Sequence, residues 1–150
     1  MGSVGGKVVS NSVSLSDRLD ALGQSLFDPP TVFGWKSGLQ WVTAAGMLER
    51  SKTAEWIADA RDPKHFVHYN PKTILGPASS KLTAAQAAQR ILEAFGIMSP
   101  TQATFNAITS YLLAQDDGTP GTFVVDKDSI DKKVRGAIAL VISSAEFQRD

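Results

Sequence analysis

The two histidines of the chain are the first residues to consider for chemistry. They stand three positions apart, at His65 and His68, and Asp59 and Asp62 precede them. On a helix, this spacing would let both imidazoles bind one metal ion together with the carboxylates, and either histidine could act as a general base. Pro63 disfavours a helix here, and the chain has no cysteine or further histidine to complete a metal site. We therefore interpret both as loop histidines with local hydrogen bonds, and we expect no metal and no other cofactor.

A second polar group is the run of aspartates near the C-terminal end. Asp126, Asp128 and Asp131 lie close together, and Asp116 and Asp117 precede them. Calcium prefers carboxylate oxygens, but the glycine and the closing glutamate of an EF-hand loop are missing. We expect these aspartates to cap a helix and to complement its dipole. The sequence has no Gly-x-Ser-x-Gly element and no phosphate-binding glycine loop, so it predicts neither a nucleophilic triad nor a nucleotide site.

The segment LFDPPTVFGW, residues Leu26–Trp35, holds large apolar side chains around two consecutive prolines. It could be a surface that docks a peptide or a sugar through Phe27, Phe33 and Trp35. It could instead be a crossover whose apolar side chains plug into a helical core. We favour the second interpretation, because burying each such side chain stabilises the fold by about 1.5–3 kcal/mol. We therefore expect the three rings to face inward, since exposed together they would form an aggregating patch.

The apolar pattern of the remaining chain is almost entirely helical, and only KVVSNSV and TFVVD could form short strands. Capping residues, prolines and glycines mark where each helix begins and ends. The expected helices are one capped by Ser16, one from Ser37 or Gly38 to about Ala60 with a break near Ser51, one capped by Thr83 with Gln86 and ending at Gly96, one starting at Ser99 and Pro100, and one from Asp128 or Ser129.

These elements predict an all-α fold, a compact bundle of about five helices with long packed loops. Residues 16–150 should form one domain, after a flexible segment 1–15 whose start, residues 1–3, looks like a cloning remnant. In the last turn, SAEFQRD, we expect Phe147 to fold back onto the helices. The expected core residues are Leu22, Leu26, Trp41, Leu48, Ile91, Leu92, Phe105, Leu112, Val134, Ile138 and Val141.

Composition excludes several classes of function. The chain has 150 residues, and its 15 basic and 15 acidic residues cancel, so it lacks the basic excess that drives binding to nucleic acid. Without cysteine it can form neither disulfides nor thiolate metal sites. No apolar run approaches the roughly 18 residues of a membrane-spanning helix. We therefore expect no nucleic-acid partner and no membrane span, whereas the oligomeric state stays open.

Two stretches resemble a known family. They are LGQSLFDPPTVFGW with the following tryptophan-bearing helix, residues 22–50, and VRGAIALVISSAEFQRD, residues 134–150. Together they are similar to the C-terminal part of the bacterial domain-of-unknown-function 1800 family, which typically has a Pro-Pro loop before Gly-Trp and ends on Ser-Pro-Glu-Phe-Gln. Ala145 replaces the proline of the second motif, and Lys36 and Ser37 stand where proline and glycine are common.

The resemblance implies a large helical bacterial protein, often exported, and a family without an established activity. We expect the chain to be the C-terminal fragment of such a protein and a non-catalytic structural or interaction module. Its partner would be the remainder of the parent chain or another protein. The alternative is an accessory part of an enzyme whose catalytic residues lie in the absent N-terminal half. In that case Trp35 and Tyr69 would line a concave ligand-binding surface.

Overall fold

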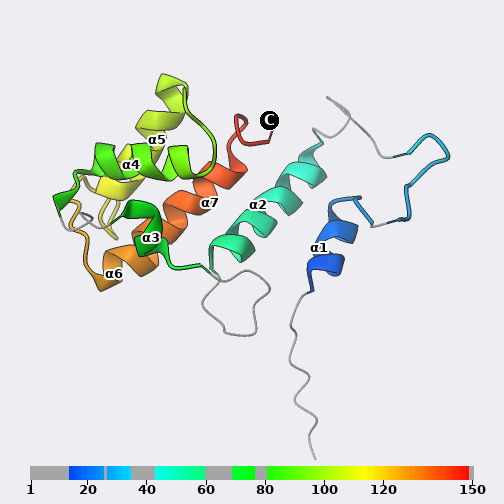
Figure 1. Cartoon of the computed structure of the whole chain (residues 1–150), viewed down its shortest axis with the longest axis horizontal. Helices are drawn as coiled ribbons and strands as arrows, with labels where there is room; N and C mark the ends of the chain where they lie inside the picture. Colours follow the sequence, from blue (N-terminus) through cyan, green and yellow to red (C-terminus); the bar gives the residue numbers. More distant parts are fainter. Residues whose placement is uncertain (1–13, 26, 35–42, 60–68, 77–80, 149–150) are drawn as a thin grey trace, which may run out of the picture.

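Apart from one isolated bridge between Ala114 and Pro120, the regular structure is helical throughout the part of the chain that the computed structural model describes, namely residues 14–25, 27–34, 43–59, 69–76 and 81–148. The all-α prediction is confirmed, and TFVVD forms no strand. The helices contact one another in a compact bundle (Figure 1). They are α1 (Leu15–Ala21), α2 (Ala44–Ala58), α3 (Pro71–Leu75), α4 (Ala84–Ala94), α5 (Gln102–Leu113), α6 (Lys127–Ser129), a π-helical turn (Ile130–Val134) and α7 (Arg135–Ser143).

Local capping explains where most helices begin. Thr83 and Gln86 form the predicted capping box of α4. At α1 the capping box is formed by Ser14 and Asp17, so the prediction of Ser16 was wrong by two residues. Thr101, which follows the expected Ser99–Pro100 pair, caps α5. The errors are small because serine and threonine occur in clusters, and any of them can accept the free amide hydrogens of a first turn.

Two predictions about the middle of the chain were wrong. Helix α2 begins at Ala44, with Thr43 as its N-cap, and continues without a break through Ser51. The connection before Thr83 contains a helix that was not predicted, α3, whose N-cap Asn70 accepts a hydrogen bond from the Lys72 amide at 3.0 Å. Pro71 occupies the first position of α3, where the missing amide hydrogen of proline costs nothing, so this proline starts a helix and does not mark a loop.

Helices α3 to α7, together with the C-terminal turn 144–148, form what we call the helical core. The apolar stripes of α4, α5 and α7 meet there, and α3 adds the fully buried Leu75. Phe105 packs against this cluster while partly exposed. Leu22 is only partly buried, Leu48 is exposed, and Leu26 and Trp41 lie outside the described residues. The predicted core residues confirmed as buried are Ile91, Leu92, Leu112, Val134, Ile138 and Val141.

Helices α1 and α2 and the loop between them, the described residues from 14 to 59, form the N-terminal arm. In Figure 1, α2 lies along α7, and α1 lies on the far side of α2 from the helical core. Only Ala54 and Ala58 of α2 are buried, and α1 has no buried residue. The Arg18 guanidinium stacks over the Trp56 ring at 5.7 Å, which joins α1 to α2. The arm is thus attached mainly through one face of one helix.

The last helical rod contains a π-helical turn. Residues 127–143 run without interruption from α6 through the turn at Ile130–Val134 into α7. A π turn contains more residues than an α turn, so it rotates the subsequent residues about the helix axis. Arg135, directly after it, is buried against the end of α2, while Val134 and Ile138 stay in the core.

None of the helices in the described ranges combines the length and the apolar character needed to cross a bilayer.

Candidate functional site

The loop after α1 exposes its apolar side chains to solvent. The exposed fraction is 90% for Phe27, 97% for Val32 and 95% for Phe33. The expectation that Phe27 and Phe33 plug into the core is therefore wrong. Burial requires a neighbouring element on the same side, and the loop leads away from the outer face of the arm (Figure 1). Trp35 lies outside the described residues, so its predicted burial is not tested.

Two hydrogen-bonded turns hold this loop, which we call the aromatic loop, residues 27–34. In the first turn, the Asp28 amide donates to the Ser25 carbonyl at 3.2 Å. In the second, the Gly34 amide donates to the Thr31 carbonyl at 3.0 Å, and the Phe33 amide donates to the Thr31 hydroxyl at 3.3 Å. Phe27 and Phe33 each occupy the third position of a turn. The two turns are joined by Pro29 and Pro30, whose rings restrict the backbone. The turns and the prolines therefore restrict the positions in which the loop can hold the aromatic rings of Phe27 and Phe33.

Tyr69, the fourth predicted ligand-binding residue, serves the fold. Its hydroxyl donates to the Ala58 carbonyl at 2.7 Å, and Arg135 Nη1 donates to the same oxygen at 3.0 Å. The Arg135 guanidinium also lies over the Tyr69 ring at 5.2 Å and bonds Asp131 Oδ1 through Nε at 3.4 Å. We call this arrangement the Ala58 clasp, because it satisfies a carbonyl at the C-terminal end of α2. Sequence reasoning missed Arg135, although an arginine inside the apolar pattern of the last helix was a usable signal.

Within the Ala58 clasp, burial favours the protonated form of the Tyr69 hydroxyl. It raises the pKa of the Tyr69 hydroxyl above its usual value, and the nearby Arg135 charge opposes this effect only in part. Tyr69 therefore stays protonated near neutral pH and keeps its hydrogen-bond donor. A phenol held in this state donates to a carbonyl and does not act as a base. Of the two residues that the enzyme-cleft alternative named, Tyr69 takes part in helix packing and Trp35 lies outside the described residues.

The two histidines that were considered as metal ligands are not tested. His65 and His68 lie outside the described residues. Among the residues that are described, no three histidine, aspartate or glutamate side chains gather closely enough to hold a metal ion. Asp126 caps the rod that starts with α6, and its Oδ1 accepts from the Ser129 amide at 2.7 Å. The capping interpretation is confirmed for Asp126, and hydrogen bonds from Ser129 lower the pKa of this carboxyl.

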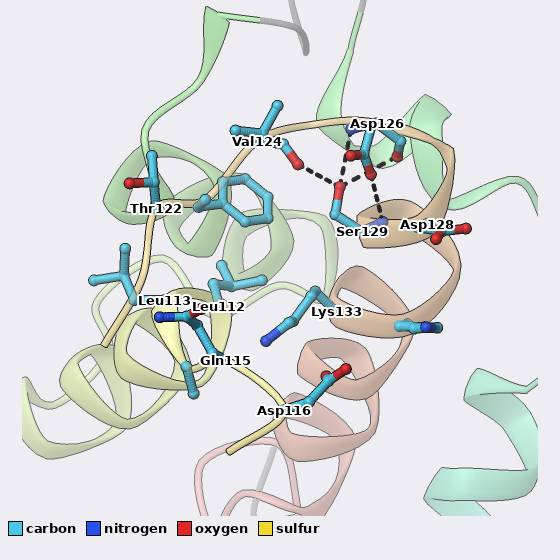
Figure 2. Close-up of a pocket in the computed structure, with 13 residues that line it drawn as sticks. Leu112, Leu113, Gln115, Asp116, Thr122, Val124, Asp126, Asp128, Ser129 and Lys133 are labelled. Atoms are coloured by element: carbon cyan, nitrogen blue, oxygen red, sulfur yellow. Dashed lines mark hydrogen bonds between the residues drawn. The ribbon is translucent and has the colours of Figure 1, made fainter. Parts of the chain in front are cut away.

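Figure 2 shows a hollow of about 380 Å³ between the end of α5, the segment 122–126 and the rod that starts with α6. Leu112 and Phe123 supply apolar lining, and Lys133 points into the hollow. The Ser129 hydroxyl donates to the Val124 carbonyl and accepts from the Asp126 amide, so it takes part in the cap of the rod that starts with α6. Lys133 lies near the C-terminal end of α5, where the helix dipole favours a cation. Asp126 and Ser129, the two lining residues with hydrogen bonds drawn in Figure 2, form the capping box of α6.

A second hollow, of about 430 Å³, lies between the starts of α3 and α6. It brings Lys72 and Lys127 near Asp126 and Asp131. Both aspartates already have partners, Ser129 for the first and Arg135 for the second. The balance of charge favours neither an anion nor a cation, so this hollow is no better candidate than the first.

The C-terminal turn, Ser144–Gln148, ties the end of the chain to three places in the helical core. Glu146 Oε1 accepts from the Thr101 amide at the start of α5 at 2.8 Å. Phe147 packs edge-on against Phe95 with ring centroids 6.0 Å apart, which confirms that it folds back. Gln148 Nε2 donates to the Ile142 carbonyl at 2.7 Å.

Comparison with models of known protein families shows which family the chain belongs to. The model of the family described as "Protein of unknown function (DUF1800)" matches residues 4–149. The chain belongs to this DUF1800 family. No curated protein and no solved structure matches it. Membership therefore supports the resemblance but supplies no activity.

The two DUF1800-like motifs differ in what they do for the fold. The second, which contains SAEFQ, is structural, because its glutamate, phenylalanine and glutamine each make one of the contacts described above. The first contains the aromatic loop, whose exposed rings touch little of the described chain. Among the described residues of the two motifs, Phe27, Val32 and Phe33 of the first are almost fully exposed.

Proposed function

We propose that the chain is a non-catalytic helical interaction module of a larger bacterial protein. The helical core acts as the scaffold, and the aromatic loop is the docking surface. The partner is the remainder of the parent protein or a separate polypeptide. The supporting observation is the nearly complete exposure of Phe27, Val32 and Phe33 on a loop held by two turns. Large apolar groups exposed together are typical of an interaction site.

The chemistry of the described residues also favours a non-catalytic role. The one serine that lines the first hollow, Ser129, donates its hydroxyl hydrogen to the Val124 carbonyl. Asp126 is committed to capping, and Tyr69 to the Ala58 clasp. All three side chains are thus engaged in hydrogen bonds that cap or join helices. The alternative role as a wall of an enzyme's cleft loses the support that Tyr69 would have given.

Photo-crosslinking in the cells that produce the native protein tests this proposal. A benzoylphenylalanine at position 33 should form a discrete crosslink to one polypeptide. The same group at position 98 is the control, because Met98 is also exposed, at 70%, but lies outside the N-terminal arm. An identical pattern at both positions, or no product at position 33, would refute the docking role. Turnover of an ester or glycan substrate by the chain alone would refute the non-catalytic role.

A further inference from the structure

Phe27 is a residue that the fold does not require. Its φ is 63°, and it is the only described residue other than glycine with a positive φ. A bulky side chain in this left-handed region is strained, because its Cβ crowds the backbone. With 90% of its surface exposed, the ring offsets little of that strain by packing. Glycine would suit the position better, which points to a role for the ring outside the fold.

The restricted geometry of the loop also suits binding. Phe27 and Phe33 occupy equivalent positions in two successive turns, with Pro29 and Pro30 between them. A binding segment that is already ordered loses less conformational entropy when it meets a partner. Aromatic side chains combine a large contact area with few rotatable bonds, so they are common among the residues that dominate binding.

The described charges that precede the loop or lie within it are mostly acidic. Over the described residues 14–25 and 27–34, the acidic residues are Asp17, Asp20 and Asp28, and the one basic residue is Arg18. Arg18 stacks on Trp56, and the Asp17 carboxylate accepts from the Ser14 amide at 2.9 Å. Asp20 and Asp28 are exposed, and Asp28 lies directly between Phe27 and the prolines. A partner that covers the rings must therefore also face carboxylates.

We infer that the aromatic loop docks into an apolar cleft flanked by lysine or arginine side chains on a partner polypeptide. This inference rests on the proposed function and adds the chemistry of the partner. The apolar part of the cleft covers Phe27, Val32 and Phe33, and the flanking cations face Asp20 and Asp28. Complementary charge at the edge of such a contact contributes orientation and specificity.

Two other occupants fit less well. A second copy docking through the same loop about a two-fold axis would bring Asp28 toward its own counterpart, which is repulsive. A lipid bilayer that received Phe27 would also draw Asp28 into an apolar environment, where a carboxylate is costly. A protein surface with an apolar cleft and basic residues beside it can cover the aromatic rings and pair with the carboxylates.

The test uses two amphipathic helical peptides of equal length, one of leucine and lysine and one of leucine and glutamate. Each is titrated into the ¹⁵N-labelled chain while amide resonances are recorded. The leucine–lysine peptide should shift the resonances of residues 27–34, and added salt should weaken its binding. The leucine–glutamate peptide should bind at least tenfold more weakly, because it offers the same apolar face with the wrong charge.

Variants separate the rings from the carboxylates. Phe27→Gly and Phe33→Ser should each weaken binding of the leucine–lysine peptide by about tenfold, the effect typical of a dominant contact residue. Asp28→Asn should weaken it by roughly twofold to fivefold, as expected for an exposed ion pair. Met98→Ser is the matched control and should change nothing. Phe27→Gly should also leave the melting temperature unchanged or raise it, because it relieves the backbone.

Several outcomes would overturn the inference. These are equal binding of both peptides, shifts confined to residues outside 27–34, or binding that survives both ring substitutions. Flotation of the chain with phosphatidylcholine vesicles through Phe27 would assign the loop to a bilayer instead. Sedimentation showing a dimer that Phe27→Gly disrupts would assign it to a second copy. If position 33 crosslinks a polypeptide but the leucine–lysine peptide does not bind, the docking role stands and only the chemistry of the partner is wrong.

Discussion

Leu48 and Leu92 both lie within α-helices, yet Leu92 is fully buried in the helical core while Leu48, in the N-terminal arm, has 57% of its surface exposed. The difference comes from the number of neighbours. Helix α4 has other helices around its apolar stripe, whereas α2 meets α7 on one face and the short α1 on another. The arm therefore carries apolar surface that the described residues leave exposed, and the aromatic loop between α1 and α2 is part of it.

The largest effect should come from a matched pair of truncations across the two regions. Leu92→Ala should lower the free energy of unfolding by about 2–5 kcal/mol, because it leaves a cavity in a packed core. Leu48→Ala should stay within about 0.5 kcal/mol of the parent, as exposed substitutions usually do. Urea unfolding followed by circular dichroism measures both. Equal losses would mean that the arm is packed as tightly as the core.

The Ala58 clasp should give an intermediate effect and show how the two regions are joined. Arg135→Met should cost about 1–3 kcal/mol, because it removes a charged donor from Ala58 and leaves Asp131 without this partner. Tyr69→Phe should cost roughly 0.5–1.5 kcal/mol. In both variants, hydrogen exchange should accelerate at the amides of α2 and much less at those of α4. Equal acceleration in α4 would show that the arm does not open separately.

The smallest effect should appear at acid pH, at one capping aspartate in each region. Hydrogen bonds from Ser14 lower the pKa of Asp17, and hydrogen bonds from Ser129 lower that of Asp126, in each case below the ordinary value of 3.8. A depressed pKa in the folded state means stability that is present above pH 3.8 and is lost as the pH falls through the folded pKa. We expect NMR titration to place both values below 3.8.

Protonation of the two aspartates should destabilise different parts of the molecule. Protonating Asp17 should fray α1 alone, whereas protonating Asp126 should weaken the rod that ends in α7 and so lower the global melting temperature. Asp126→Asn should reduce the acid sensitivity of the melting temperature, and Asp17→Asn should not. If both substitutions have the same effect, α1 is coupled to the core more strongly than its contacts suggest.

Most of the helical core could be predicted from sequence, because its apolar residues repeat at helical spacing and its caps follow known preferences. Ile91, Leu92, Ile138 and Val141 were predicted to be buried and are buried. A periodic stripe indicates which face is apolar. It predicts burial correctly when neighbouring elements are available to cover that face.

The aromatic loop shows where such reasoning fails. Its rings were expected inside because burial is favourable, but sequence pattern alone does not reveal whether a covering element exists. In the described structure Phe27 and Phe33 are almost fully exposed. The clasp was missed for a related reason, because it joins Arg135 to Ala58 across 77 positions.

The π turn at Ile130–Val134 has a consequence for comparing members of the family. Insertions and deletions are usually placed in loops, where the chain can absorb a change of length. A homologue with a regular α-helix here would be one residue shorter within the rod, and its correct alignment would contain a gap inside a helix. If an alignment moved that gap to the nearest loop, Arg135 would be paired with the wrong residue of the homologue. The arginine that binds the Ala58 carbonyl would then look variable among homologues, although only the alignment register was wrong.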